Sequence, residues 1–367
     1  MDTYGPTAGQ PDPPPFAHPV HEPGGTPPPP PPPRRGRSSA ALALGLMAVL
    51  AVVVGGVVLM GFAAVALVGL GSDDQTEEHY HSLARHAGDK VAIITVEGTI
   101  LDGDGFAKKQ IDRVREDKHV KAIVLRVNSP GGSVTGSDYL YHHLTKLAKE
   151  REIPIVVSMG GIAASGGYYV AMAVGDQPDT IFAEPTTWTG SIGVVIPHYN
   201  MAGLMQKWEI EEDSVKSHPL KQMGTPTKKM TAEERTIFQA LVDDSFGRFK
   251  QIVLAGRPKL RDNPKILDRV ATGQVFTTRD ALAAGLVDRE GFIEDAIDRA
   301  IELAGLDKDR TKVVKYKRRT GLLDFGLSAR AGSRGPDLAT LLDMTTPRAY
   351  YLCTWLPSMG PPATGEE

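Results

Sequence analysis

Two side chains in this sequence have the chemistry and the setting to break an acyl bond together. Ser165 lies in the small-residue segment Ile162-Ala-Ala-Ser-Gly-Gly-Tyr-Tyr169, and Lys221 lies further on, in a segment that ends at Pro226. A serine at a small-residue turn that opens a helix presents its hydroxyl beside backbone N–H groups. A lysine that a dry pocket keeps neutral can accept the serine proton, because desolvation penalises the charged form. The pattern predicts nucleophilic catalysis with Ser165 as the nucleophile, for which a neutral lysine such as Lys221 could serve as general base.

A pair of glycines upstream predicts a place for the oxyanion of such a reaction. Gly131 and Gly132 follow an apolar strand pattern at 121–127 and precede a helix pattern. This is the point in an open α/β sheet where ligands bind. Backbone N–H groups of the Gly-Gly turn, together with that of Gly166 after the serine, can stabilise an oxyanion, and Asn128 is expected to brace the loop.

Each of these residues also has an ordinary structural explanation. Ser165 would look the same if it only capped the N-terminus of the following helix. Lys221 is one of several lysines in this part of the chain, and a Pro-Gly turn is common without any function. His218 and His198 are alternative bases for a Ser–His pair, although neither is accompanied by a carboxylate as in a full triad.

Strand and helix patterns alternate through the part of the chain that carries these residues. Apolar runs at 90–97, 121–127 and 153–158 predict buried strands, and helical periodicity at 107–117 and 139–149 predicts helices between them. This alternation predicts an α/β fold with a mostly parallel sheet covered by helices. Further elements are predicted at 180–184 and 189–196 (strands), 231–256 (a helix with a Thr231–Glu234 capping box), 273–288 (strand, turn and helix), 293–304 (helix) and 312–317 (strand).

The first 71 residues predict a tail and a membrane anchor. Half of the 28 prolines lie before Arg34, so residues 1–38 are predicted to be a disordered or polyproline II tail in the cytoplasm. No charged residue occurs between Arg37 and Asp73, and this stretch exceeds the ~20 residues that a spanning helix needs. Residues 39–71 are therefore predicted to be one transmembrane helix, with a cleaved signal peptide as the alternative.

The charges beside this apolar stretch predict its orientation. Arginines precede it and acidic residues follow it, so the positive-inside rule places the N-terminus in the cytoplasm and the rest of the chain on the outer side of the cell membrane. We expect a linker at 72–89, a catalytic domain at 90–317 and a C-terminal extension at 318–367.

Composition excludes several classes of function. A net charge of −3 with no basic stripe gives no sign of a nucleic-acid partner. Cys353 is the single cysteine, so it cannot form a disulfide within the chain, and it lacks the companions of a zinc site. No metal or other cofactor is predicted.

The segments around Gly131, Ser165 and Lys221, in this order, resemble the membrane-bound signal peptide peptidases of peptidase family S49, in their short, single-domain form. The resemblance covers about residues 90–317 and implies a fold like that of ClpP and the crotonases, with repeated ββα units. It implies that Ser165 and Lys221 form a catalytic dyad and that Ser191 orients the lysine amine by a hydrogen bond. One departure is His218-Pro219, where the family has a small residue after the serine.

The same resemblance implies a substrate and an assembly. The expected activity is that of a serine endopeptidase that degrades cleaved signal peptides. The expected assembly is a homo-oligomer in which neighbouring subunits supply the serine and the lysine of each dyad. A crotonase-like acyl-CoA enzyme is the main alternative, since it shares the fold and the oxyanion donors but needs acidic catalytic residues. A non-catalytic membrane scaffold is the other.

Overall fold

The structure, a computed structural model, describes residues 56, 76–318 and 350–352. The chain divides into two units, residues 1–71 and 72–367, and every element discussed below belongs to the second. None of the helices formed by the described residues combines the length and apolar character needed to cross a bilayer. The predicted tail and, apart from Gly56, the predicted anchor lie outside the described residues.

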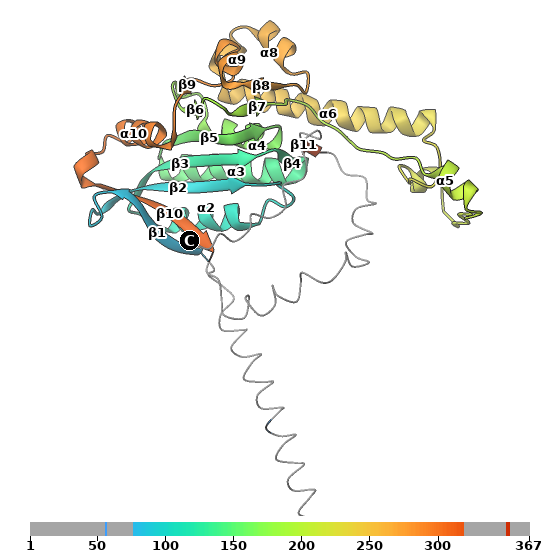
Figure 1. Ribbon diagram of the computed structural model, residues 1–367, viewed down its shortest axis with the longest axis horizontal. Helices are drawn as coiled ribbons and strands as arrows, with labels where there is room; N and C mark the ends of the chain where they lie inside the picture. Colours follow the sequence, from blue (N-terminus) through green and yellow to red (C-terminus); the bar gives the residue numbers. More distant parts are fainter. Residues whose placement is uncertain (1–55, 57–75, 319–349, 353–367) are drawn as a thin grey trace, which may run out of the picture. The chain divides into compact units, whose positions relative to one another are not determined.

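A nine-stranded, mostly parallel sheet forms the centre of the second unit (Figure 1). Its three central strands are parallel neighbours, and their apolar residues form almost continuous runs, as expected for strands buried on both faces. In spatial order the strands are β1 (Thr76–Leu83), β10 (Thr311–Arg318), β2 (Asp89–Glu97), β3 (Val120–Ser129), β5 (Ile155–Ala164), β6 (Ile181–Ala183) and β9 (Arg289–Glu290).

Four short strands lie off this path. β7 (Trp188–Gly190) runs parallel to the last residues of β5 and antiparallel to β8 (Val275–Thr277). β4 (Gly131–Ser133) pairs with β11 (Tyr350–Leu352) in a separate antiparallel sheet of two strands. These short pairs lie at the C-terminal ends of β3 and β5.

Helices cover both faces of the sheet, and the pleat of the strands explains why. Ala92 and Ile94 of β2 belong to one core, while Val91 and Ile93 belong to the other. Successive side chains of a strand point to opposite faces, so each face needs its own cover. One face packs against α2 (Phe106–Glu116), α3 (Val134–Arg151), α4 (Gly166–Ala171) and α6 (Ala232–Gly256), and the other against α10 (Ile293–Leu303).

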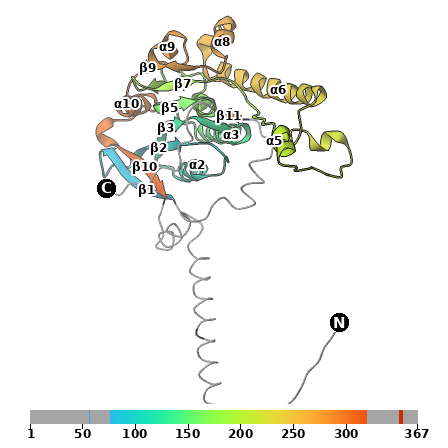
Figure 2. The same cartoon turned by 45° about the vertical axis from the view of Figure 1, so that its right-hand side comes forward.

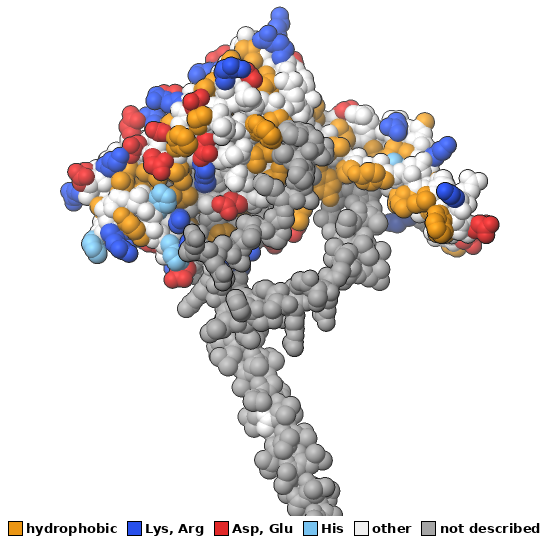
Figure 3. All heavy atoms as spheres, in the orientation of Figure 1, with side chains coloured by type: hydrophobic (Ala, Val, Ile, Leu, Met, Phe, Trp, Pro, Cys, Tyr) orange, Lys and Arg blue, Asp and Glu red, His pale blue; other side chains and the backbone are white. Residues whose placement is uncertain are grey.

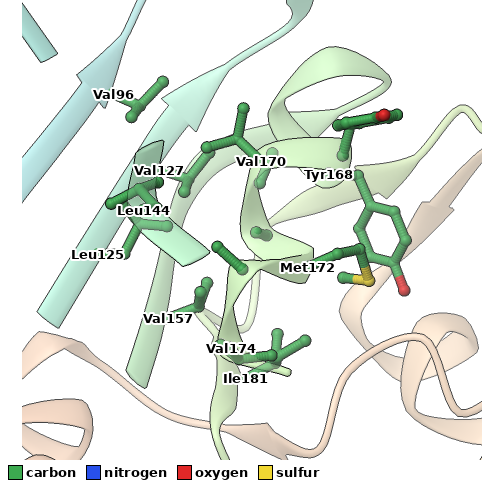
Figure 4. Packing of buried hydrophobic residues seen from close by; sticks show 14 of the residues in the cluster. Val96, Leu125, Val127, Leu144, Val157, Tyr168, Val170, Met172, Val174 and Ile181 are labelled. Atoms are coloured by element: carbon green, nitrogen blue, oxygen red, sulfur yellow. The ribbon is translucent and has the colours of Figure 1, made fainter. Parts of the chain in front are cut away.

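Figure 4 shows part of the larger core. Leu125 and Val127 of β3 lie near Leu144 of α3 and Val170 of α4, and all four side chains are fully buried. The remaining helices are α5 (Ala202–Lys207), α7 (Pro258–Arg261), α8 (Pro264–Val270), α9 (Thr278–Ala283) and the short 3-10 helices η1 (Met172–Val174), η2 (Pro219–Gln222) and η3 (Lys308–Arg310).

A buried ion pair joins the end of α6 to the sheet. Arg257 donates to both carboxylate oxygens of Asp288 at 2.7 and 2.9 Å, and its Nε donates to the Gly285 carbonyl oxygen at 2.9 Å. The same carboxylate accepts the N–H groups of Thr180 and Ile181 at the start of β6. Every oxygen of this buried carboxylate therefore has a donor, which is the condition for a charge to be tolerated inside a protein.

The predicted α/β class with its mostly parallel sheet is confirmed. The capping box at the start of α6 is also confirmed, because Thr231 Oγ1 accepts the N–H of Glu234 and the Glu234 carboxylate accepts the N–H of Thr231. Strands and helices were predicted in the right order, with bounds that differ by a few residues.

Two predictions are wrong. Part of the predicted linker at 72–89 forms the edge strand β1, which pairs antiparallel with β10 through its backbone and needs few apolar side chains. The predicted strand at 189–196 ends at Gly190, because Gly190 and Ser191 have φ angles of 83° and 51° and turn the chain away.

Candidate active site

Ser165 lies at a sharp turn between β5 and α4. Its backbone has φ 54° and ψ −116°, which a residue with a Cβ rarely adopts. Its N–H donates to the Gly190 carbonyl oxygen at 2.7 Å, and its own carbonyl accepts the N–H of Tyr169 at 2.8 Å. The hydroxyl makes no capping hydrogen bond, so the interpretation of Ser165 as a simple helix cap is wrong. A strained strand-to-helix turn is the geometry that exposes the nucleophile of many hydrolases.

The turn has room only because its neighbours are glycines. A Cβ on Gly131 would lie 2.6 Å from the Gly166 nitrogen and 3.1 Å from Ser165 Cβ, and Gly131 has φ 102°. A Cβ on Gly166 would lie 2.4 Å from Ser137 Oγ. The structure therefore brings the predicted residues Gly131, Gly132 and Gly166 together around Ser165.

Hydrogen bonds fix the loop that carries the two glycines. The Gly131 N–H donates to Ser129 Oγ at 3.1 Å, and that hydroxyl donates to the Gly98 carbonyl oxygen at 2.6 Å. The Gly131 N–H is thus already engaged within the loop. Asn128 Oδ1 accepts the N–H of Ile162 at 3.2 Å, so Asn128 ties the end of β3 to β5 just before Ser165.

Ser191 lies beside Ser165 because the two strands that precede them are paired. Ala164 of β5 lies opposite Gly190 of β7, and each serine is the next residue of its chain segment. Ser191 is 6% exposed, and its N–H donates to the Gln274 carbonyl oxygen at 2.7 Å. Among the described residues no hydrogen bond occupies the Ser191 hydroxyl, which leaves it available to another group.

Lys221 is on a separate arm of the molecule. It belongs to η2 and is exposed, and no hydrogen bond joins it to Ser165 or Ser191 in the described part of the chain. Its segment folds back on α5 around a cavity of about 750 Å³ that residues of both line, at the end of α6 away from the sheet (Figure 1, Figure 2). The predicted dyad is therefore not assembled within one copy of the chain.

Neither of the two histidines weighed as alternative bases is hydrogen-bonded to Ser165 within the described residues. His218 is exposed, and its Nδ1 accepts the N–H of Leu220 at the start of η2. His198 has a buried Nε2 without a hydrogen-bond partner among the described residues. Within residues 76–318 and 350–352 no group of three or more His, Cys, Asp or Glu side chains could hold a metal ion.

Strand β11, which lies against the site, was not predicted. Tyr351 is opposite Gly132 in an antiparallel pairing, and the Tyr351 carbonyl oxygen lies 2.0 Å from where a Cβ on Gly131 would be. Three residues near the C-terminus carry no periodic signal, and only the tertiary fold places them here. Ser129 supports the glycine loop, and Ser137 lies against the turn at Gly166. Neither serine was predicted as a site residue, because neither belongs to a recognisable local pattern.

The chain is similar in sequence to known peptidases. The sequence profile of peptidase family S49 matches residues 147–307, which include Ser165, Ser191 and Lys221. The chain is 39% identical over 224 residues to "Putative protease slr0021" of Synechocystis sp., covering 61% of this chain and 78% of that protein.

Two further relatives are matched over different shares of their own length. The chain is 34% identical over 262 residues to "Putative signal peptide peptidase SppA" of Enterococcus faecium, covering 68% of this chain and 73% of that protein. It is 33% identical over 276 residues to "Protease 4" of Salmonella typhi, covering 71% of this chain but 43% of that protein. With a strained serine turn flanked by glycines and similarity of this extent, the chain belongs to peptidase family S49.

Proposed function

We propose that the protein is a membrane-anchored serine endopeptidase that uses Ser165 and Lys221 to hydrolyse peptide bonds, with released signal peptides as substrates. Membership of peptidase family S49 supports the peptidase activity. The observation that carries the proposal is the Ser165 turn, whose hydroxyl is not used for capping and whose surroundings are backbone N–H groups and glycines. We further propose the ClpP/crotonase-like arrangement of repeated ββα units for its core.

The reaction follows from these groups. Ser165 Oγ attacks the peptide carbonyl carbon while its proton passes to the amine of Lys221. The charge that develops on the carbonyl oxygen meets the N–H groups of Gly132 and Gly166, whereas Gly131, whose N–H is engaged by Ser129, contributes space. The protonated amine then gives its proton to the leaving nitrogen. A water that the same amine deprotonates hydrolyses the acyl-serine and restores the enzyme.

We propose that Lys221 reaches Ser165 of a neighbouring copy in a homo-oligomer. The support is an apolar arm that has no partner within the described part of the chain. Orange side chains gather on this arm in Figure 3. The exposed large apolar residues of the arm and of the adjoining part of α6 are Tyr199, Met201, Leu204, Trp208, Ile210, Val215 and Leu241. Contiguous apolar surface of this kind is typical of a protein–protein interface.

We propose that Lys221 of the neighbouring copy enters through a cavity beside Ser191. It measures about 470 Å³. Ser191, Gly193 and Val194 line one side, and α6 lines the other with Gln239, Val242, Asp243 and Phe246. The apolar side chains of Val194, Val242 and Phe246 disfavour a charged amine, while the Asp243 carboxylate acts in the opposite direction. The free Ser191 hydroxyl can orient the amine lone pair. We therefore propose that Ser191 orients the lysine amine.

Subunit mixing tests the shared dyad. Full-length Ser165→Ala and Lys221→Ala variants should each be inactive toward a fluorogenic apolar peptide, because each lacks one member of a catalytic unit. Co-expressed in one membrane, the two variants should regain part of the activity, since some sites then receive an intact serine and an intact lysine. Lys229→Ala, an exposed lysine nearby, is the matched control and should retain full activity.

Several results would contradict the proposal. Activity that survives Lys221→Ala but is lost in His218→Ala would make the base a histidine. Inactive mixtures would place the serine and the lysine of one dyad in the same subunit. Turnover of an acyl-CoA instead of the peptide would favour the crotonase-like alternative.

We also propose that residues 39–71 cross the cell membrane once, with the N-terminus in the cytoplasm and the catalytic domain outside. The support is the long uncharged apolar stretch, with arginines before it and acidic residues after it. A phosphatase reporter that works only after export should be active when fused after Glu367 and inactive when fused at Pro19. The reverse pattern would overturn the orientation.

A further inference from the structure

The cavity beside Ser191 has a single ionisable side chain on its walls. Residues 191–195 and 271–273 line two sides of it and carry no acidic or basic group, and α6 lines the third side. Asp243 of α6 is therefore the one charged residue that lines the cavity in the part of the chain that the structure describes. This carboxylate determines how the cavity receives a charged group from outside.

The periodicity of α6 places Asp243 on the wall of the cavity. The residues of this helix that line the cavity follow the spacing i, i+3, i+4, i+7, which puts them on one face; they are Gln239, Val242, Asp243 and Phe246. Gln239 Nε2 donates to Asp243 Oδ1 at 2.8 Å, so the amide one turn earlier orients the carboxylate. Within residues 76–318 and 350–352, Asp243 Oδ2 accepts no hydrogen bond and no cation pairs with the carboxylate. The carboxylate thus keeps a free acceptor.

Lys221 is a cation that also lacks a partner. No hydrogen bond or ion pair engages its amine among the described residues. The lysines on either side of it in the same segment are both engaged, since Lys216 donates to Gln222 and Lys228 pairs with Glu234. The proposed function brings Lys221 of a neighbouring copy into the cavity. An unpaired amine would then meet an unpaired carboxylate, and the two are complementary in charge.

We propose that Asp243 is a positioning residue for the base: its carboxylate holds the Lys221 amine of a neighbouring copy beside Ser191 and sets the pH at which the peptidase becomes active. The inference rests on the proposed function and adds its regulation by pH. A carboxylate beside an amine favours the protonated amine, so a more alkaline solution is needed to free the base. The same carboxylate stabilises the ammonium that forms when the Ser165 proton moves to the amine, which assists that step once the base is neutral.

Other titratable groups at this contact come from the arriving segment. It carries His218 and Lys216 beside Lys221. His218 Nδ1 accepts the N–H of Leu220, and Lys216 is engaged by Gln222. Both groups can only add positive charge, which would favour the neutral amine and oppose the effect of the carboxylate. An alkaline shift that depends on Asp243 therefore cannot come from either of them.

The pH dependence of kcat/KM tests the pair on the full-length protein in detergent. In wild type kcat/KM should rise with pH and level off as the amine loses its proton. In Asp243→Asn, which keeps the shape of the side chain, the midpoint of this rise should fall by about one pH unit, the effect of one nearby opposite charge. A merely structural role would lower the rate without moving the midpoint.

Asp244→Asn is the matched control for this measurement. It removes the next carboxylate of α6, which does not line the cavity, and should leave the midpoint where it is in wild type. An unchanged or higher midpoint in Asp243→Asn, or an equal fall in both variants, would overturn the inference.

Subunit mixing shows which copy holds the acting carboxylate. When Ser165→Ala and Lys221→Ala chains are co-expressed, every complete site takes its serine from the Lys221→Ala chain and its lysine from the Ser165→Ala chain. Asp243→Asn added to the Lys221→Ala chain should lower the midpoint, whereas Asp243→Asn added to the Ser165→Ala chain should leave it unchanged. Both mixtures carry the same substitutions, so a difference between them is not an effect of stability. Any other pattern would contradict the inference.

Carbodiimide coupling separates this inference from the proposed function. The reagent joins a carboxylate and an amine that are in contact through an amide bond. On the full-length protein it should link Asp243 of one copy to Lys221 of another, as mass spectrometry of the linked dimer would identify. The link should be lost in Asp243→Asn and retained in Asp244→Asn. A link in a protein that hydrolyses no peptide at any pH would support the contact and contradict the proposed function alone. Hydrolysis without the link would overturn the inference and leave the proposed function intact.

Discussion

Removal of Arg257 from its buried pair with Asp288 should be one of the most destabilising single substitutions in the domain. Arg257→Met removes two hydrogen bonds to Asp288 and one to the Gly285 carbonyl, and it leaves a carboxylate with 4% exposure. Breaking a buried ion pair by removing one partner costs about 3 to 5 kcal/mol. The N–H groups of Thr180 and Ile181 still reach the carboxylate, so we expect the lower end, about 3 kcal/mol.

Thermal unfolding followed by circular dichroism measures this loss. For a domain of this size, about 3 kcal/mol corresponds to a fall in Tm of about 6 to 12 °C. Arg289→Met is the matched control, because Arg289 pairs with Asp179 at the exposed surface and should leave the Tm unchanged. If Arg257→Met lowers the Tm no more than Arg289→Met does, the buried pair contributes nothing beyond a surface pair and the reasoning fails.

The pH dependence gives a second check on the same pair. Burial alone would raise the pKa of Asp288, but Arg257 outweighs burial and lowers this pKa below its usual value. A carboxylate with a depressed pKa in the folded state contributes stability above its unfolded value of about 3.9, and this contribution is lost as the pH falls through the folded pKa. The Tm difference between wild type and Arg257→Met should therefore shrink below about pH 4. A difference as large at pH 3 as at pH 7 would contradict the assignment.

Three further substitutions have defined outcomes. Gly131→Ala should lower kcat/KM by at least about tenfold, because the new Cβ would clash with the backbone beside Ser165 and because Gly131 has a positive φ. Wild-type activity of this variant in a peptidase assay would contradict the prediction. Tyr168→Phe should lower the Tm by about 2 to 4 °C, since it removes a buried hydrogen bond to the Leu286 carbonyl oxygen that contributes about 1 kcal/mol. An unchanged melting curve would refute this expectation. Thr231→Ala should cost about 1 kcal/mol in denaturant unfolding through loss of the cap of α6, whereas Thr231→Ser should restore it.

The sequence predicted most of the sheet because its central strands are buried on both faces. Short apolar runs such as 121–127, rich in β-branched residues, are typical of core strands, and the helices between them bury one apolar face. β1 was missed because it is an edge strand of mixed polarity, held by backbone pairing rather than by apolar burial. A pattern based on side chains carries little information about such a strand.

The candidate site was predictable where chemistry constrains residue type. Ser165 and the glycines at 131, 132 and 166 stand out because only small residues fit a turn this tight, and the structure brings them together. Its surroundings were not predictable. β11 depends on a pairing between residues far apart in the sequence, and the separation of Lys221 from Ser165 depends on how the arm folds. Neither leaves a local pattern.

The order of strands in the sheet has a consequence for how the domain is made. β10 is inserted between β1 and β2, and Thr76 at the start of β1 lies opposite Arg318 at the end of β10. While the chain is being synthesised, β2, β3 and β5 can pair, but the outer edge of β2 stays open until residue 318 has left the ribosome. Closing that edge requires contacts of large sequence separation, which form slowly. The nascent chain is thus most exposed to aggregation through the edge of β2 just before β10 emerges and pairs with it.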